Sequence, residues 1–289
     1  MDKLRVGTRK SQLSRKQTEL ALAALRKAHP VLETEIVPFQ TRGDTILDKP
    51  LWQLSNKGKG VFASEFEEMI LKDEIDIAIH SGKDLPIFLA EGLEIIGVLQ
   101  RDDPRDVLVM PKGKTPEDCR IIGTGSLRRE QCAKEIFPWA ECRLIRGNIQ
   151  TRLKKLRDGC YDAILLAKAG LDRMGITEEE GYTFRILSPE EFLPAACQGI
   201  IVAEGKPKRE LVEVVGKMTH EETKALFETE REVLMRLNAD CSEPVAAFAE
   251  WKGGDIRLRV MYGAAFAEGT APGAERLQLA AEVVGRLKP

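Results

Sequence analysis

The sequence predicts an α/β fold, with two α/β domains followed by a small α+β domain. Short apolar runs typical of strands alternate with helical patterns along most of the chain, which favours a largely parallel sheet in each half. The runs AILLA at 163–167 and EIIGVL at 94–99 are apolar at almost every position, as expected for strands covered on both faces. After Pro207 a long helical stretch precedes strands around the Gly-Gly pair at 253–254, which indicates the third domain.

The individual elements follow from apolar periodicity, taken in chain order. Strands are expected at the runs LRVGT, LETEIVPF, EIDIAIH, LEIIGVL, DVLVM, RIIGT, CRLIRG and YDAILLA. Helices are expected where apolar residues recur with helical spacing, at 11–28, 63–72 and 149–158. This order is typical of domains in which helices cover both faces of a sheet.

Two segments of turn-like composition predict the connections between the halves. The first is RDDPRDVLVMPKGK at 101–114, and the second is LPAACQGIIVAEG at 193–205. We therefore predict three domains, which comprise residues 1–99 with 197–216, residues 100–196, and residues 217–289.

The composition excludes several classes of protein. The 44 Lys and Arg residues nearly balance 46 Asp and Glu residues, so a nucleic-acid binder that relies on bulk charge is not expected. No segment approaches the roughly 18 consecutive apolar residues of a membrane span, and the N-terminus shows no signal region, so we expect a cytoplasmic protein. The six cysteines are scattered without a C-x-x-C pair, so neither a disulfide framework nor a metal site is expected.

Two distant segments read almost alike, RVGTRKSQLSRKQ at 5–17 and IIGTGSLRREQ at 121–131. Each has an apolar run, a Gly-Thr pair, a Ser and paired basic residues at the start of a helical pattern. At such a turn, backbone N–H groups and the positive end of the helix dipole converge, and cationic side chains add charge. Two such anion sites predict a ligand with several negative groups. The glycines of GTGS also suggest a dinucleotide enzyme, but the G-x-G-x-x-G spacing is absent.

Basic residues concentrate at or just past the predicted strand ends. Guanidinium groups bind carboxylates through two parallel hydrogen bonds, which suits a substrate with several carboxylates. Charge runs are more often solvated faces, and Lys154 with Lys155 fits that description. The strand-end cations are Arg9, Lys10, Arg15, Lys83, Arg128, Arg129, Arg146 and Arg152.

The segment EIDIAIHSGKDLP at 74–86 carries the best candidate for a catalytic carboxylate. Its isoleucines alternate as in a strand, and polar residues gather at the carboxyl end, where ligands bind in open α/β sheets. Asp84 beside Lys83 would stay ionised at neutral pH, able to stabilise a developing cation and to move a proton. The alternative is that Asp84 caps a helix or turn before Pro86. His80 is interpreted as a buried or capping histidine.

Residues 41–62 show no sustained periodicity and are rich in Asp, Lys and Gly. Long loops of this kind inside compact domains are often lids. We predict a mobile lid that includes Lys57, Lys59 and Phe62 and brings its lysines to a ligand. A solvated basic loop without a role is the alternative reading of the same composition.

The order of these motifs resembles the porphobilinogen deaminase family, also called hydroxymethylbilane synthases. The motifs that carry the resemblance are RVGTRKSQL, TRGD, KGKGVF, HSGKDLP, GTGSLRR, RGNIQTRL, LPAACQG and a Cys in NADCSEP. They cover essentially the whole chain, and the ordered set is far more specific than any single motif.

The resemblance implies two periplasmic-binding-protein-like α/β domains around a cleft, with a small third domain. It also implies that Cys241 carries a covalent dipyrromethane cofactor through a thioether, although sequence alone makes Cys241 one thiol among six. Members of this family join four porphobilinogen molecules head to tail, releasing ammonia each time, to form hydroxymethylbilane in tetrapyrrole biosynthesis. A small-molecule substrate and a monomer are therefore expected.

The resemblance further assigns roles to individual residues. Asp84 would bond pyrrole N–H groups and stabilise the positive charge that develops, with Lys83 and Arg9 beside it in the catalytic group. Every pyrrole carries an acetate and a propionate, so cationic residues are expected to position the growing polyanion. The expected cofactor-binding residues are Ser11, Lys83, Asp84, Thr124, Ser126, Arg128, Arg129, Arg146, Gly147, Arg152, Gln198 and Cys241.

Four stretches depart from the family pattern. Gly82 stands where a bulky residue is usual, which gives the loop that presents the carboxylate more conformational freedom. Cys197 precedes Gln198 where glycine is common. Asp240 replaces a usual glycine, and its carboxylate disfavours a neighbouring thiolate. Residues 14–16, Ser-Arg-Lys, replace an apolar stretch of the first helix.

A non-catalytic protein that binds polycarboxylates is the alternative function. Such a protein would keep the arginines but would need neither Asp84 nor Cys241. It would ordinarily be exported, whereas no signal region is seen at the N-terminus of this sequence.

Overall fold

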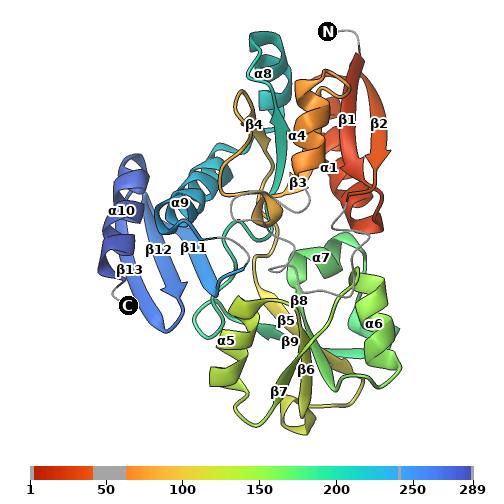
Figure 1. The fold of residues 1–289 in the computed structure, drawn as a ribbon, viewed down its shortest axis with the longest axis vertical. Coiled ribbons are helices and arrows are strands. Elements are labelled where there is room, and N and C mark those ends of the chain that lie inside the picture. Colours follow the sequence, from red (N-terminus) through yellow and green to blue (C-terminus); the bar gives the residue numbers. More distant parts are fainter. Residues whose placement is uncertain (1–2, 42–62, 240–241, 288–289) are drawn as a thin grey trace.

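The computed structural model describes residues 3–41, 63–239 and 242–287. These residues form two five-stranded sheets and one three-stranded sheet. The two larger sheets lie at opposite ends of the long axis, and the smaller sheet lies to one side, near the C-terminus (Figure 1). The predicted class of two α/β domains with a small α+β domain is confirmed. The residue boundaries of the three domains stay predictions.

The first sheet has the strand order β2-β1-β3-β10-β4. Strand β1 runs parallel to β2 and β3, whereas β10 runs antiparallel to both β3 and β4. Strand β10 is separated in sequence from the other four strands by the whole second sheet. The bounds are β1 (Lys3–Arg9), β2 (Glu33–Phe39), β3 (Ile77–Ser81), β4 (Glu94–Val98) and β10 (Ile201–Gly205).

The second sheet has the order β7-β6-β8-β5-β9. Strand β6 runs parallel to β7 and β8, whereas β5 runs antiparallel to β8 and β9. All five strands come from one continuous segment of chain. The bounds are β5 (Asp106–Pro111), β6 (Ile121–Thr124), β7 (Glu141–Leu144), β8 (Ala163–Ala167) and β9 (Tyr182–Leu187).

Both five-stranded sheets are mixed: in each, four strands run in one direction, as the prediction of largely parallel sheets implies, and one strand runs against them. The antiparallel strand is the fourth of each sheet, and it enters from a connection out of the other half. It therefore starts where the parallel strands end: Ile201 of β10 pairs with Ser81, and Asp106 of β5 pairs with Ala167. Because β5 and β10 lie inside the two predicted connections, the connections themselves are shorter than predicted.

Helices cover both faces of the first sheet. Ser11 caps α1, and Leu22 and Leu25 of that helix lie one turn apart and are fully buried against β1 and β3. On the opposite face, Phe66 and Ile70 of α4 pack against the sheet in a separate apolar cluster. The helices are α1 (Gln12–Ala28), α4 (Ser64–Leu71) and α8 (Arg209–Val215), and the first two match the predicted helices to within one residue at each end.

The second sheet is covered in the same way. Alternate residues of β5 face opposite sides: Leu108 and Met110 join the cluster that includes α5, while Val107 and Val109 join the cluster of α6 and α7. This alternation with both faces buried explains why the strand is apolar at every position. The helices are α5 (Leu127–Ile136), α6 (Ile149–Arg157) and α7 (Lys168–Arg173).

The third sheet is an antiparallel meander, β11-β12-β13, covered by two helices. Its bounds and those of its helices are β11 (Val245–Lys252), β12 (Asp255–Tyr262), β13 (Ala265–Pro272), α9 (Glu221–Leu237) and α10 (Arg276–Arg286). The sequence analysis did not foresee α10. In the described part of the chain, no helix combines the length and apolar character that crossing a membrane requires.

An ion pair ties the third sheet and its helices to the first connection. Arg101 Nη1 lies 2.7 Å from Glu230 Oε1 of α9, and both side chains are almost completely buried. Arg101 Nε donates to the Gln198 carbonyl at 2.9 Å. Glu230 also accepts the backbone N–H groups of Cys197 and Ala249. Burial raises the pKa of Glu230, and the Arg101 charge acts in the opposite direction.

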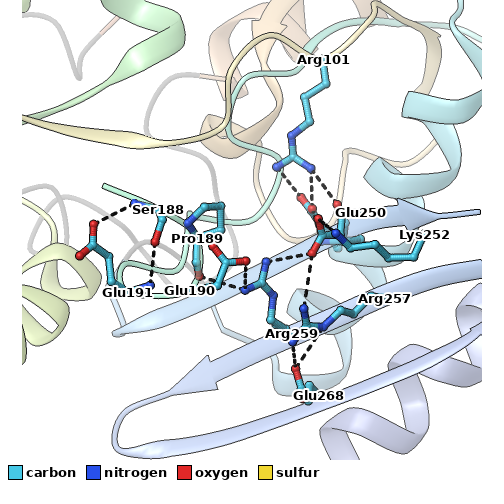
Figure 2. Close-up of polar contacts among 12 residues, drawn as sticks. Arg101, Ser188, Pro189, Glu190, Glu191, Glu250, Lys252, Arg257, Arg259 and Glu268 are labelled. Carbon is cyan, nitrogen blue, oxygen red and sulfur yellow. Dashed lines mark hydrogen bonds and ion pairs between the residues drawn. The ribbon is translucent and has the colours of Figure 1, made fainter. Parts of the chain in front are cut away.

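The same junction continues across β11 and β12 (Figure 2). Arg259 of β12 pairs with Glu190 at 3.1 Å and with Glu250 of β11 at 3.0 Å. The guanidinium of Arg259 lies over the Phe248 ring, with its Cζ atom 5.3 Å from the centroid of the ring. We call the whole set the junction network, which comprises Arg101, Lys252, Arg257 and Arg259 with Glu190, Glu230, Glu250 and Glu268.

Candidate active site

The two repeated segments each form a strand, a short turn and a helix. In the first, the Ser11 hydroxyl accepts the backbone N–H of Ser14 at 3.2 Å; in the second, the Ser126 hydroxyl accepts that of Arg129 at 3.4 Å. Thr124 Oγ1 accepts the Ser126 N–H at 3.2 Å. Both serines are therefore helix N-caps. The roles of Ser11, Thr124 and Ser126 toward a ligand stay predictions.

The second repeat brings two buried arginines onto one carboxylate. Arg128 Nη2 lies 2.9 Å from Asp106 Oδ2, and Arg129 Nη2 lies 2.8 Å from Asp106 Oδ1. One further nitrogen of each arginine donates to a backbone carbonyl, Arg128 Nη1 to that of Leu193 and Arg129 Nη1 to that of Leu165. Because α5 begins at residue 127, its first turn aims both guanidiniums at the start of β5.

Asp106 is a functional candidate that the sequence analysis missed. Burial alone would raise the pKa of this carboxyl, but Arg128 and Arg129 outweigh burial and hold it at about 2. Asp106 is the first residue of an antiparallel strand, so the start of the strand faces the site. The available signal was the acidic residue at the start of the predicted strand DVLVM, but the sequence gives no sign that this strand runs antiparallel and so starts at the site.

Gln198 links the two sheets through its side-chain amide. Its Oε1 accepts a hydrogen bond from Lys83 Nζ at 3.1 Å. Its Nε2 donates to Asp106 Oδ1 at 3.1 Å and to the Pro104 carbonyl at 2.7 Å. The fully buried amide thus connects the end of β3 with the start of β5.

Lys83 and Asp84 lie in a single 3₁₀ turn, Gly82–Asp84, directly after β3. Burial lowers the pKa of Lys83 to about 8; repulsion from Arg129 adds to this effect, while Asp84 and Asp106 oppose it. Asp84 is half-buried and interacts electrostatically with Lys83, Arg129 and Arg152. The predicted carboxylate therefore lies among cations.

The start of α6 adds two more arginines. Burial lowers the pKa of Arg152 to about 10, and repulsion from Arg129 and Arg146 adds to the effect. Burial also lowers the pKa of Arg146, and Arg9 at the end of β1 acts in the same direction. Gly147 has φ +114°, and a Cβ there would lie 2.7 Å from Thr151 Cγ2. Only glycine suits this backbone, which turns the chain so that both arginines reach the site.

Together these groups form what we call the anion cluster. Counted over the described residues, it holds six cations and two carboxylates. Such a cluster can bind and orient a ligand with several carboxylates. Within the described ranges, no group of three or more His, Cys, Asp or Glu side chains could hold a metal ion. The members are Arg9, Lys83, Arg128, Arg129, Arg146 and Arg152 with Asp84 and Asp106.

Other predicted residues fall outside this cluster. Lys10 and Arg15 are exposed. Two cavities at the surface of the described residues, about 630 and 350 Å³, are lined by none of the predicted site residues. The remaining predicted positions lie outside the described residues; they are Lys57, Lys59 and Phe62 of the predicted lid, Cys241, and Asp240.

The departures at positions 82 and 197 have a structural explanation. Cys197 has φ +61°, in the left-handed region that favours glycine. Gly82 lies so close to Cys197 that a Cβ at position 82 would be 3.0 Å from the Cys197 Cβ. The two positions are therefore in direct contact beside the site.

Comparisons with known proteins show the family to which this chain belongs. A family model described as "Porphobilinogen deaminase, dipyromethane cofactor binding domain" matches residues 4–213. A porphobilinogen deaminase of Ruminiclostridium josui is 40% identical over 262 residues, 91% of this chain and 87% of the relative. One of Alkaliphilus oremlandii is 41% identical over 261 residues, 90% of this chain and 86% of the relative. The solved periplasmic aliphatic sulphonate binding protein SsuA from Escherichia coli is 15% identical with a TM-score of 0.43, over 82% of this chain and 70% of its own.

The family model spans most of the chain, and both relatives align along nearly all of it. The domain that the model describes binds a dipyrromethane cofactor. The chain belongs to the porphobilinogen deaminase family, whose members are enzymes of tetrapyrrole biosynthesis.

Proposed function

We propose that this chain joins four porphobilinogen molecules head to tail, with release of ammonia, to give hydroxymethylbilane. The observation that carries the proposal is the anion cluster, in which six cations face two carboxylates. Each porphobilinogen unit has two carboxylates. A bound chain of such units would place several carboxylates against these cations.

The donor set also fits a dipyrromethane cofactor. Arg128 Nε is buried and has no hydrogen-bond partner among the described residues. Arg152 makes one hydrogen bond, from Nε to the Gly147 carbonyl at 2.9 Å, and no ion pair within that part of the chain. With Lys83, Arg129 and Arg146 these side chains would hold the carboxylates of the cofactor. When bound, the cofactor supplies the pyrrole end to which new units are added.

We assign the attachment of the cofactor to Cys241. Support comes from the start of β11, four residues further along the chain. Ala246 belongs to the same buried apolar cluster as Leu193, and the Leu193 carbonyl accepts a hydrogen bond from Arg128 at 2.7 Å. The start of β11 therefore packs in the same apolar cluster as Leu193, the residue whose carbonyl binds Arg128 of the anion cluster.

Asp84 is proposed as the catalytic carboxylate. It is half-buried next to Lys83 and interacts electrostatically with Arg129 and Arg152. An ionised carboxylate can accept hydrogen bonds from pyrrole N–H groups and stabilise positive charge as it develops. It can also take up a proton from the carbon at which two units are joined. Lys83, Arg9 and the other cations would hold the substrate carboxylates while this happens.

The first test is the intact mass of the denatured, purified protein. We expect an excess equal to two linked pyrrole units, which Cys241→Ala removes and Cys160→Ala, a change at an exposed cysteine, leaves in place. An unmodified protein is incubated with porphobilinogen and measured again. No adduct on Cys241 after incubation contradicts the attachment.

The second test separates catalysis from binding alone. Asp84→Asn keeps the size of the side chain but removes its charge, and we expect kcat to fall by about 10²–10³-fold while the adduct on Cys241 is retained from added preformed cofactor. Consumption of porphobilinogen and release of ammonia are the measurements. A wild-type chain that binds porphobilinogen without releasing ammonia is the non-catalytic polycarboxylate-binding protein instead.

The monomeric state and the cytoplasmic location are part of the same proposal. The overall chain shows near-balanced charge, with 44 basic and 46 acidic residues, so binding of nucleic acid is not proposed. Light scattering at two protein concentrations checks the oligomeric state. A mass of 32.2 kDa at both is expected.

A further inference from the structure

The turn that carries Lys83 and Asp84 rests on a second turn, residues 197–200. The pairing of β3 with β10 ends at Ser81 and Ile201, and one more hydrogen bond follows, from Gly82 N–H to the Ile200 carbonyl at 2.9 Å. The Ile200 N–H in turn donates to the Cys197 carbonyl at 3.2 Å. The backbone of residues 197–200 therefore fixes the position of the turn Gly82–Asp84.

A side chain at position 82 would meet its neighbours at less than the usual contact distance. A Cβ built there would lie 3.0 Å from the Cys197 Cβ, 3.3 Å from Phe227 Cε2 and 3.4 Å from the Cys197 carbonyl oxygen. Favourable contacts between carbon atoms fall at about 3.5–4.0 Å. The phenyl ring can shift by a few tenths of an ångström, but a Cβ follows its own backbone and cannot rotate away.

The backbone of Cys197 is itself held in place. Its φ of +61° is uncommon for a residue with a side chain, and its N–H donates to Glu230 Oε2 at 2.5 Å. The side chain is buried, and its Sγ lies 3.8 Å from the Phe227 carbonyl. Glu230 is fixed in turn by Arg101. The Cys197 Cβ is therefore a rigid point behind the turn of Lys83 and Asp84.

We propose that Cys197 is a positioning residue for the turn Gly82–Asp84 and acts through its Cβ, not through its thiol. Positions 82 and 197 form a steric pair in which only one member can carry a side chain. A side chain on both would push the turn away from residues 197–200. Lys83 would then lose its hydrogen bond to Gln198, and Asp84 would leave its place among the cations.

The experiment is a comparison of Gly82→Ala in three backgrounds: Cys197, Cys197→Ala and Cys197→Gly. The Ala background removes the sulfur and keeps Cβ, whereas the Gly background removes both. We expect Gly82→Ala to lower kcat by about 10- to 100-fold in the Cys and Ala backgrounds, with a smaller change in KM. In the Gly background the same substitution is expected to change kcat by less than about threefold. Equal losses in all three backgrounds, or a rescue by Cys197→Ala as complete as that by Cys197→Gly, overturn the proposal.

The kinetic comparison rests on the proposed function, so a second measurement is made without substrate. The urea midpoint of unfolding is determined for the same six proteins. A lower midpoint caused by Gly82→Ala in the Cys and Ala backgrounds, and absent in the Gly background, supports the steric pair even if the parent chain releases no ammonia. A parent chain without turnover contradicts the proposed function, and a midpoint change independent of the background contradicts the steric pair.

Discussion

The junction network and the anion cluster both combine cationic side chains, mostly arginines, with carboxylates, but their charge balance differs. The junction network has four cations and four carboxylates (Figure 2). The anion cluster has six cations and two carboxylates. In the first, each cation lies within ion-pair distance of a carboxylate; in the second, burial and mutual repulsion lower the pKa of Lys83, Arg146 and Arg152.

This difference separates two uses of the same side chain. A balanced pair such as Arg101 with Glu230 is complete without a ligand, so its removal should affect folding. An unbalanced group such as Arg152 gains from an added anion, so its removal should affect binding. The four predictions that follow test this separation, from the largest expected effect to the smallest.

The largest effect is expected in the junction network. Arg101→Met leaves the Glu230 carboxylate buried without its cation, which should lower the free energy of unfolding by about 3–5 kcal/mol. Urea unfolding at neutral pH measures it. The second change Glu230→Gln, which removes the stranded charge and keeps an acceptor for the backbone N–H groups, should restore part of the loss. A loss below about 1 kcal/mol would show that the pair contributes little.

The next effect is expected in the anion cluster, and on binding. Arg152→Gln should weaken the binding of porphobilinogen by about 1.5–3 kcal/mol, or roughly 10- to 100-fold, because it removes a charged hydrogen-bond donor. The free energy of unfolding should be unchanged or slightly higher, because repulsion from Arg129 and Arg146 is relieved. Calorimetric titration in an Asp84→Asn background avoids turnover. Lys154→Gln, an exposed cation on the same helix, is the control, and equal affinities of the two variants would refute the assignment.

Asp106 belongs to the anion cluster but forms ion pairs with Arg128 and Arg129. Its removal should therefore lower the free energy of unfolding, as expected for residues of the junction network. Its pKa is about 2 in the folded chain and 3.8 as the ordinary value, so its contribution is present above pH 3.8 and is lost as pH falls toward 2. That contribution is on the order of 2 kcal/mol. The difference in unfolding free energy between wild type and Asp106→Asn should therefore shrink from pH 6 to pH 3. A difference that is constant over this range would mean that Asp106 does not titrate there.

The smallest effect concerns Lys83, whose charge is lost near pH 8. Raising the pH from 7 to 9 should weaken the binding of porphobilinogen by a few-fold, on the order of 1 kcal/mol, because the ammonium is neutralised. Stability should change in the opposite direction, since the unfolded chain binds more protons than the folded chain between pH 8 and 10.5. Lys83→Arg, which stays charged, should remove the change in affinity. A pH dependence that persists in Lys83→Arg must come from another group.

The sequence predicted those parts of the fold and site that depend on local pattern. Periodicity located α1, α4 and α6 to within one residue, because their apolar positions and caps are all close in sequence. The repeated Gly-Thr segments located both turns in which Ser11 and Ser126 cap helices. The buried arginines after the second turn were also expected, as a group at strand ends.

What the sequence did not predict depends on strand direction. A segment of chain carries no sign of running antiparallel to strands far away, so DVLVM was predicted as a strand without its direction, and Asp106 at its start was missed. Gln198 stands three residues before β10 and was expected only from the resemblance to a family. The contact between Gly82 and Cys197 joins positions more than a hundred residues apart, and neither residue alone indicates it.

The position of β10 also determines when the N-terminal sheet can form. During synthesis β1 to β4 leave the ribosome first, yet β3 and β4 are joined only through β10, which is made after all of β5 to β9. Until then both strands expose unpaired edges, a hazard for aggregation. The second sheet is continuous in sequence and can close earlier. The half of the chain that is translated first is therefore expected to complete its fold last.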